Sequence, residues 1–134
     1  GGVIGPATRR WGEGRVIILG LCGLVAGFAL MPVASGMSLL LVATALLAGG
    51  FGLCNPALNS LISRRASSDS QGAVLGVAQS GASLARILGP AFAGVVFSLL
   101  GRHAPYIIGA LLLLFALGIA WRMIQSSDVD AAEQ

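Results

Sequence analysis

Apolar residues fill most of this chain in long runs that short polar stretches separate. Three runs, Val16–Ala34, Ser38–Ile62 and Tyr106–Ile124, reach or approach the roughly 20 apolar residues that an α-helix needs to cross about 30 Å of hydrocarbon. A fourth run, Gly72–Leu100, begins polar and ends apolar. Because the connections are short, consecutive helices should form hairpins. The pattern predicts an all-α fold, an integral membrane helical bundle with four transmembrane helices.

The composition agrees with this pattern. Hydrophobic residues make up 56% of the chain and charged residues 10%, with a mean hydropathy of +0.90. In soluble domains roughly a quarter of all residues are charged, so the chain belongs in a bilayer. The first run is too long for a cleavable signal peptide and three more follow it. Since no Met precedes Gly1, we expect this to be a cut end.

The arginines predict the orientation. If the N-terminal loop is cytoplasmic, six arginines fall on that side and only Arg102 lies outside. This asymmetry favours a cytoplasmic C-terminus. Because the arginines sit in short loops beside apolar runs, they indicate membrane orientation and no nucleic-acid binding.

Glycines cluster on the first three predicted helices. Small residues let helix backbones approach closely in lipid, where the hydrophobic effect does not drive packing. We interpret most of these glycines as packing positions, and they are Gly20, Gly23 and Gly27, then Gly49, Gly50 and Gly52, then Gly76, Gly81, Gly89 and Gly94.

A polar stripe runs along the third predicted helix. Gln79, Ser83, Arg86 and Pro90 are spaced at offsets of 0, 4, 7 and 11, so at 3.6 residues per turn they share one face. Arg86 is the middle residue of the run, about 21 Å from each end. Pro90 has no N–H for the carbonyl of Arg86, which predicts an opened turn at that point.

A charge at this depth must face protein or water. It costs from about 2.5–3.5 kcal/mol on insertion scales to roughly 10 or more in simulations. The four runs contain no Asp or Glu, so backbone, an anion or another part of the protein must supply the partner. Arg86 either lines a transport pathway or extends along the helix to bond carbonyls and hold neighbouring helices together.

The second predicted helix repeats this arrangement. Its polar face holds Thr44, Gly52, Asn55, Asn59 and Ser63. Pro56 has no N–H to donate to the carbonyl of Gly52, so that carbonyl loses its hydrogen bond within the helix. Two carboxamides four residues apart can either bond to another helix or line a cavity, and the pattern leaves both interpretations open.

The stretch GPATRRWGEGR, Gly5 to Arg15, resembles the cytoplasmic loop motif of the major facilitator superfamily, G-x-x-x-D-R-x-G-R-R. The matching positions are Gly5, Arg10 and Gly12. The departures are Arg9 in place of Asp, and Glu13 and Gly14 in place of the closing Arg pair, with Arg15 one place beyond. Such degeneracy is typical of the second copy of this loop, between helices eight and nine.

The stretch QSGASLARILGPAFAG, Gln79 to Gly94, is similar to the eleventh helix of drug-efflux members, including the tetracycline-efflux branch. The resemblance implies a C-terminal fragment of a transporter with a twelve-helix fold. Residues 1–15 would be the end of helix eight and the loop, and helices nine to twelve would be 16–34, 38–62, 72–100 and 105–124. The remaining 125–134 hold three acids and are expected to be a disordered cytoplasmic tail.

The resemblance implies secondary active transport by alternating access, with a substrate site between two halves of the fold. We expect proton-coupled efflux of a small organic compound or drug, with the coupling acid in N-terminal helices outside this chain. Arg86, Gln79, Ser83, Asn55 and Asn59 are the expected substrate-pathway residues. The expected hinges are Pro56, Pro90, Gly52 and Gly89.

Three alternatives remain. A complete four-helix multidrug exporter would need a titratable carboxylate in the membrane, which the runs lack. A non-transporting membrane scaffold or assembly subunit would explain the glycines and asparagines but not the loop motif. An enzyme has the least support, because His103 is the only His and the sequence offers no nucleophile with a base and no metal-ligand or cofactor-binding pattern.

Overall fold

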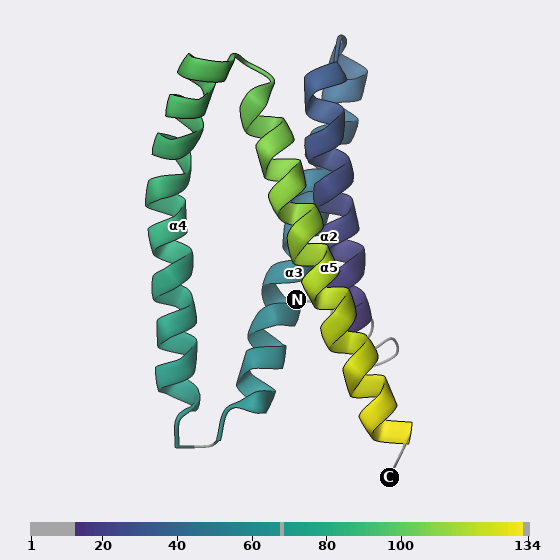
Figure 1. Ribbon diagram of the computed structural model, residues 1–134, viewed down its shortest axis with the longest axis vertical. Helices are drawn as coiled ribbons and strands as arrows, with labels where there is room; N and C mark the ends of the chain where they lie inside the picture. The colour runs from purple at the N-terminus through teal and green to yellow at the C-terminus, as the bar shows by residue number, and fades with distance from the viewer. Residues whose placement is uncertain (1–12, 68, 133–134) are drawn as a thin grey trace.

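The computed structural model describes residues 13–67 and 69–132. Within these ranges the chain forms four long α-helices: α2 (Glu13–Leu30), α3 (Met37–Arg65), α4 (Gln71–Leu100) and α5 (Ala104–Ala132) (Figure 1). A 3-10 turn, η1 (Met31–Val33), continues α2 and contains Pro32. All four long helices have the length and apolar character of membrane spans.

The last helix is longer than its apolar run. Residues 125–132, expected to be disordered, are helical and belong to α5. No Gly or Pro follows Gly118, so nothing in the local sequence ends the helix where its apolar residues stop.

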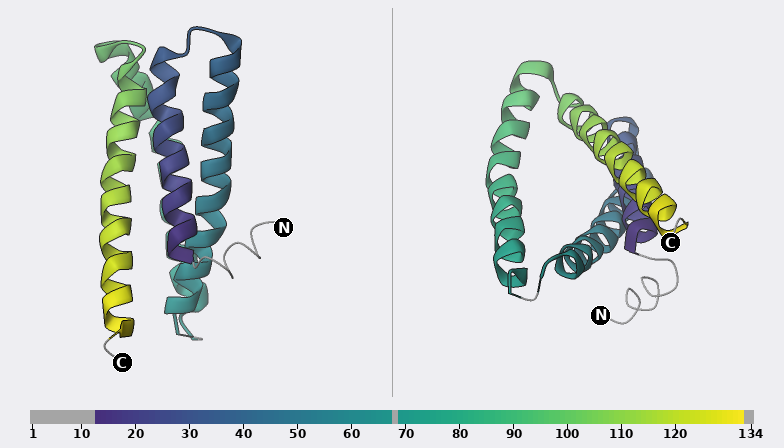
Figure 2. Two further views of the ribbon diagram at one scale, coloured as in Figure 1. Left: turned by 90° about the vertical axis from the view of Figure 1, so that its right-hand side faces the viewer. Right: turned by 60° about the horizontal axis from the view of Figure 1, so that its bottom comes forward.

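Three of the helices pack together and the fourth stands apart. Helix α2 lies against both α3 and α5, whereas α4 has few contacts with any of them. It approaches α3 at the connection 66–70 and α5 at the connection 101–103, and it diverges between these points (Figures 1 and 2). At the second connection Gly101, with φ of 87°, ends α4 in a conformation that side chains disfavour.

The contact between α2 and α3 is the tightest in the described chain. Val16, Ile17 and Ala57 form its buried cluster, against which Leu21, Leu53 and Leu61 pack. Farther along, Gly20 faces Gly50. A Cβ on Gly50 would lie 2.6 Å from the carbonyl oxygen of Gly20, which is closer than real Cβ contacts come. The two backbones are therefore in direct contact, as expected for glycines in lipid.

Helix α5 packs on a neighbouring face of α2. A Cβ on Gly14 would lie 2.8 Å from Cγ1 of Ile124, and one on Gly109 would lie 2.8 Å from Cε1 of Phe28. The Phe28 ring also contacts the Tyr106 ring, with centroids 6.5 Å apart and planes tilted by 51°. Glycine on one helix thus receives a bulky side chain from the other at both ends of this interface.

The glycines of α4 behave differently. Among the described residues, no atom beyond the local helix lies within 4 Å of a Cβ placed on Gly72, Gly76, Gly81, Gly89 or Gly94. The packing interpretation is therefore confirmed for Gly20, Gly23, Gly27 and Gly50, which have close neighbours. On α4 the described chain supplies nothing for the glycines to pack against.

We predict that Gly50→Ala destabilises the full-length protein by about 1–3 kcal/mol, because the new methyl group forces the α2 and α3 backbones apart. The adjacent Gly49→Ala is the matched control, since its Cβ meets no atom within 4 Å. Thermal unfolding in detergent measures both. Equal midpoints for the two variants would contradict the direct backbone contact.

Candidate functional site: the polar faces of α3 and α4

Helix α4 has three faces of different character. The side chains that are at least partly buried lie on one face, and they are Gln71, Leu75, Ala78, Ala82, Ala93 and Val96. Most of the large exposed apolar side chains lie on a second, and these are Val74, Val77, Leu84, Leu88, Phe92, Val95 and Leu99. Of the others, Ile87 lies between this face and the polar one, Phe97 falls on the polar face, and Leu100 falls on the partly buried face. The third face carries Gln79, Ser83, Arg86 and Pro90. At 100° per residue, this polar stripe lies beside the partly buried face and well away from the apolar face that suits lipid.

Arg86 lies near the middle of α4 and is exposed. It forms no hydrogen bond or ion pair with any described residue, and the same holds for Gln79 and Ser83. Ser80, next to this face, instead bonds the carbonyl oxygen of Gly76 at 2.9 Å. A guanidinium without a partner at mid-membrane depth requires water, an anion or a carboxylate from elsewhere.

The polar face of α3 lies opposite its contact with α2. Thr44 is satisfied within its own helix, since its hydroxyl bonds the carbonyl oxygens of Leu40 at 2.9 Å and Leu41 at 3.0 Å. Asn55 is half-buried and Asn59 exposed, and neither has a hydrogen bond within the described chain. Their carboxamides are available to a ligand or to another helix.

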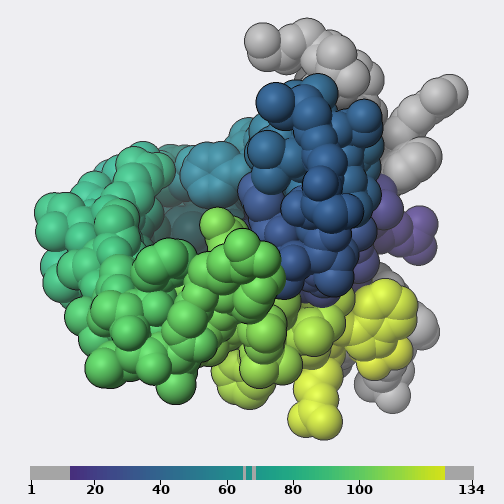
Figure 3. All heavy atoms as spheres, turned by 90° about the horizontal axis from the view of Figure 1, so that it is seen from above, coloured from purple at the N-terminus to yellow at the C-terminus, as the bar shows by residue number. Residues whose placement is uncertain are grey.

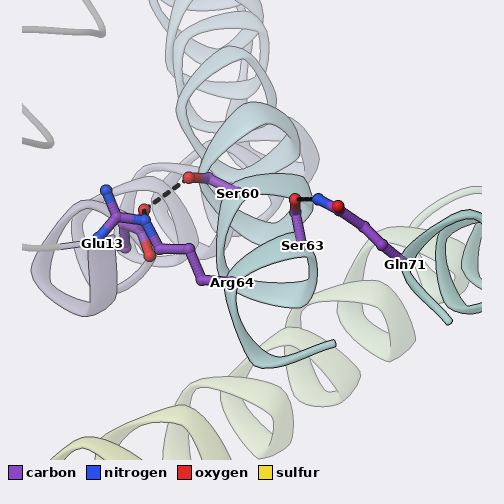
Figure 4. A network of polar contacts seen from close by, with 5 residues as sticks. All are labelled: Glu13, Ser60, Ser63, Arg64 and Gln71. Carbon is purple, nitrogen blue, oxygen red and sulfur yellow. Dashed lines mark hydrogen bonds and ion pairs between the residues drawn. The ribbon is translucent and has the colours of Figure 1, made fainter. Parts of the chain in front are cut away.

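Among the described residues, a side-chain hydrogen bond joins α3 and α4 only at one end. Near the connection 66–70, the amide Nε2 of Gln71 donates a hydrogen bond to Oγ of Ser63 (Figure 4). Beyond this point no hydrogen bond between described residues joins α3 to α4. Seen from above, a hollow separates α4 from the other helices (Figure 3). The structure does not bring Asn55 and Asn59 into contact with Arg86.

The proposed hinge residues lie within continuous helices. Helix α3 continues through Pro56 and α4 through Pro90. Cβ atoms on Gly52 and Gly89 would meet nothing within 4 Å in the described chain. Neither glycine therefore packs against a described neighbour.

A second polar group, which the sequence did not reveal, joins α2 to α3. Oε1 of Glu13 accepts a hydrogen bond from Oγ of Ser60 at 2.5 Å and forms an ion pair with Nε of Arg64 at 3.0 Å (Figure 4). The Glu13 side chain is only 12% exposed, against 75% for Arg64. In the sequence, Glu13 stands out only as a departure from the loop motif. The sequence pattern that could have indicated this group is Ser60 and Arg64, which lie four residues apart and so share one face of their helix.

The loop motif is described only in part. Gly5, Arg10 and Gly12 lie outside the described residues. Arg15 is exposed in the first turn of α2, where it lines a surface groove with Ile18, Leu19 and Trp121.

Comparison with known proteins identifies the class. The family model of the Major Facilitator Superfamily matches residues 1–133, and the chain belongs to this superfamily of membrane transporters. This confirms the predicted family and the membrane helical bundle. No solved structure matches the chain.

Among its relatives, the class G tetracycline resistance protein of Vibrio anguillarum is 34% identical over 95% of this chain and 33% of its own length. Multidrug resistance protein 2 of Bacillus subtilis is 32% identical over 87% of this chain and 29% of its own length. The human synaptic vesicular amine transporter is 28% identical over 98% of this chain and 26% of its own length. The chain thus spans about a third of the length of these relatives or less.

We predict that Glu13→Ala destabilises the full-length protein by about 1–2 kcal/mol, mostly through the lost bond to Ser60, because Arg64 is largely solvated. The exposed Asp69 gives a matched control, Asp69→Ala, that removes a carboxylate from the connection between α3 and α4. Chemical denaturation in detergent would compare the two. An equal effect of both variants would show that the Glu13 cluster adds nothing beyond its charge.

Proposed function

We propose that this chain is part of a secondary active transporter that exports a small organic compound by alternating access. The observation that carries the proposal is the unpartnered polar face of α4, with Arg86 at its centre. A protein keeps a costly charge at this depth where the charge has a task. The tetracycline and multidrug resistance relatives support efflux as that task.

In this proposal the polar faces of α3 and α4 line the substrate pathway. Arg86 pairs with an anionic group of the substrate or with a carboxylate from a part of the protein outside this chain. Ser83 and Gln79 extend the same face by about one and two turns, and Asn55 and Asn59 offer hydrogen bonds from α3. Pro56 and Pro90, with Gly52 and Gly89, are the hinges.

We further propose that α2 to α5 are helices nine to twelve of a twelve-helix transporter in a bacterial inner membrane, with the C-terminus in the cytoplasm. The degenerate loop motif before α2 supports this position, and the greater length of the relatives supports further helices. Protons drive export through an acid in those further helices, since the four apolar runs of this chain contain no Asp or Glu. No enzymatic step belongs to this function.

We predict that Arg86→Gln lowers substrate efflux about 10- to 100-fold, the effect of losing a charge-assisted hydrogen bond in the pathway. Arg122→Gln is the control, because Arg122 is an exposed arginine near the inner end of α5 and off the polar faces. Tetracycline accumulation in cells that express each full-length variant at equal membrane abundance gives the readout, with ethidium as a second substrate. Wild-type efflux of both compounds by Arg86→Gln would contradict the proposed role.

Protection of an introduced cysteine by substrate distinguishes a transporter from the scaffold alternative. In a transporter, substrate should slow the alkylation of Ser83→Cys, because the two compete for one face. A scaffold offers no ligand to compete, so alkylation of Ser83→Cys would proceed at the same rate with and without substrate.

A further inference from the structure

A groove with a cavity volume of about 400 Å³ runs along the surface between α2 and α5, away from the polar faces of α3 and α4. Arg15, Ile18, Leu19 and Trp121 line it. Ile18 and Leu19 follow Arg15 by about one helical turn, so the groove has a cationic end and an apolar continuation. Nothing in the proposed transport pathway uses these residues.

The cation of this groove is not neutralised within the described chain. Arg15 is exposed and forms no hydrogen bond or ion pair with a described residue. Glu13, the nearest acid on α2, lies on the opposite face, because two residues turn a helix by about 200°. Its carboxylate is already bound by Ser60 and Arg64.

The position of the groove along the helices matches a membrane interface. Gly14, beside Arg15, faces Ile124, so the groove lies near the last apolar turns of α5. Trp121 is 53% exposed there, and tryptophan is favoured at the level of lipid headgroups. Ile18 and Leu19 lie deeper, toward the hydrocarbon.

We propose that this groove binds one anionic phospholipid of the inner leaflet. Arg15 contacts the phosphate, Trp121 lies against the glycerol region, and one acyl chain follows Ile18 and Leu19. Two observations favour this occupant over a further helix. A helix covering the groove would have to bring its own carboxylate to Arg15, whereas every anionic phospholipid carries the needed phosphate, and the exposed Trp121 suits the headgroup level. The choice of leaflet rests on the orientation given under the proposed function, but binding of the lipid does not depend on transport.

The test uses the full-length protein, delipidated in detergent and titrated with dioleoyl phosphatidylglycerol, while native mass spectrometry counts bound lipids. We expect one retained phosphatidylglycerol and no comparable retention of phosphatidylcholine. Arg15→Gln should weaken retention about fivefold at low salt, the effect of one arginine near an anionic lipid, and Arg15→Lys should keep most of it. Arg122→Gln is the matched control and should bind as the wild type does.

A second variant tests the apolar half of the groove independently. Trp121→Ala should reduce retention while leaving every arginine in place. The proposal is overturned if the wild type retains no phosphatidylglycerol, which would mean that another part of the protein covers the groove. It is equally overturned if Arg15→Gln binds like the wild type, or if Arg122→Gln loses as much as Arg15→Gln, which would indicate attraction by overall charge.

Discussion

Gly20 on α2 and Gly50 on α3 bring two helix backbones into direct contact, at a separation that no side chain would permit. Inside a bilayer the hydrophobic effect does not press helices together, so close van der Waals packing has to hold them. Because this contact and the Val16–Ala57 cluster commit one face of α3 to α2, the opposite face, with Asn55 and Asn59, is left open. The glycine contact thus determines which polar groups remain available for function.

Helix α4 shows the complementary situation. Its connections tie it to α3 and α5 at its two ends, but most of its length lacks a neighbour within the described chain (Figure 1). Most of its large apolar side chains point away from its polar stripe, so a single lipid environment cannot suit both. An amphipathic span of this kind is stable when water, substrate or further protein covers the stripe. The isolated glycines of α4 are consistent with the same requirement.

Local periodicity accounts for what could be predicted from the sequence. Runs of apolar residues indicated the four spans, and the 3.6-residue repeat placed Gln79, Ser83 and Arg86 on one face. Periodicity could not predict the Glu13–Ser60 bond, which joins residues 47 positions apart and depends on the pairing of α2 with α3.

The rotation of one helix against another could not be predicted from the sequence either. Gly50 packs while Gly49 does not, because that difference depends on how α3 is turned against α2. The helical end of α5 was missed for another reason, since polar composition alone favoured disorder over a helix that continues past the apolar run.

We infer that one face of α4 borders a water-filled pathway while another borders lipid. The most direct test is single-cysteine labelling in native membranes with a membrane-impermeant maleimide, after Cys22→Ala and Cys54→Ala remove the natural thiols of this chain. We expect Gln79→Cys and Ser83→Cys to be modified, whereas Leu84→Cys and Leu88→Cys should react only after the protein is denatured. Equal labelling at all four positions, or labelling of the leucine face alone, would contradict this placement of α4.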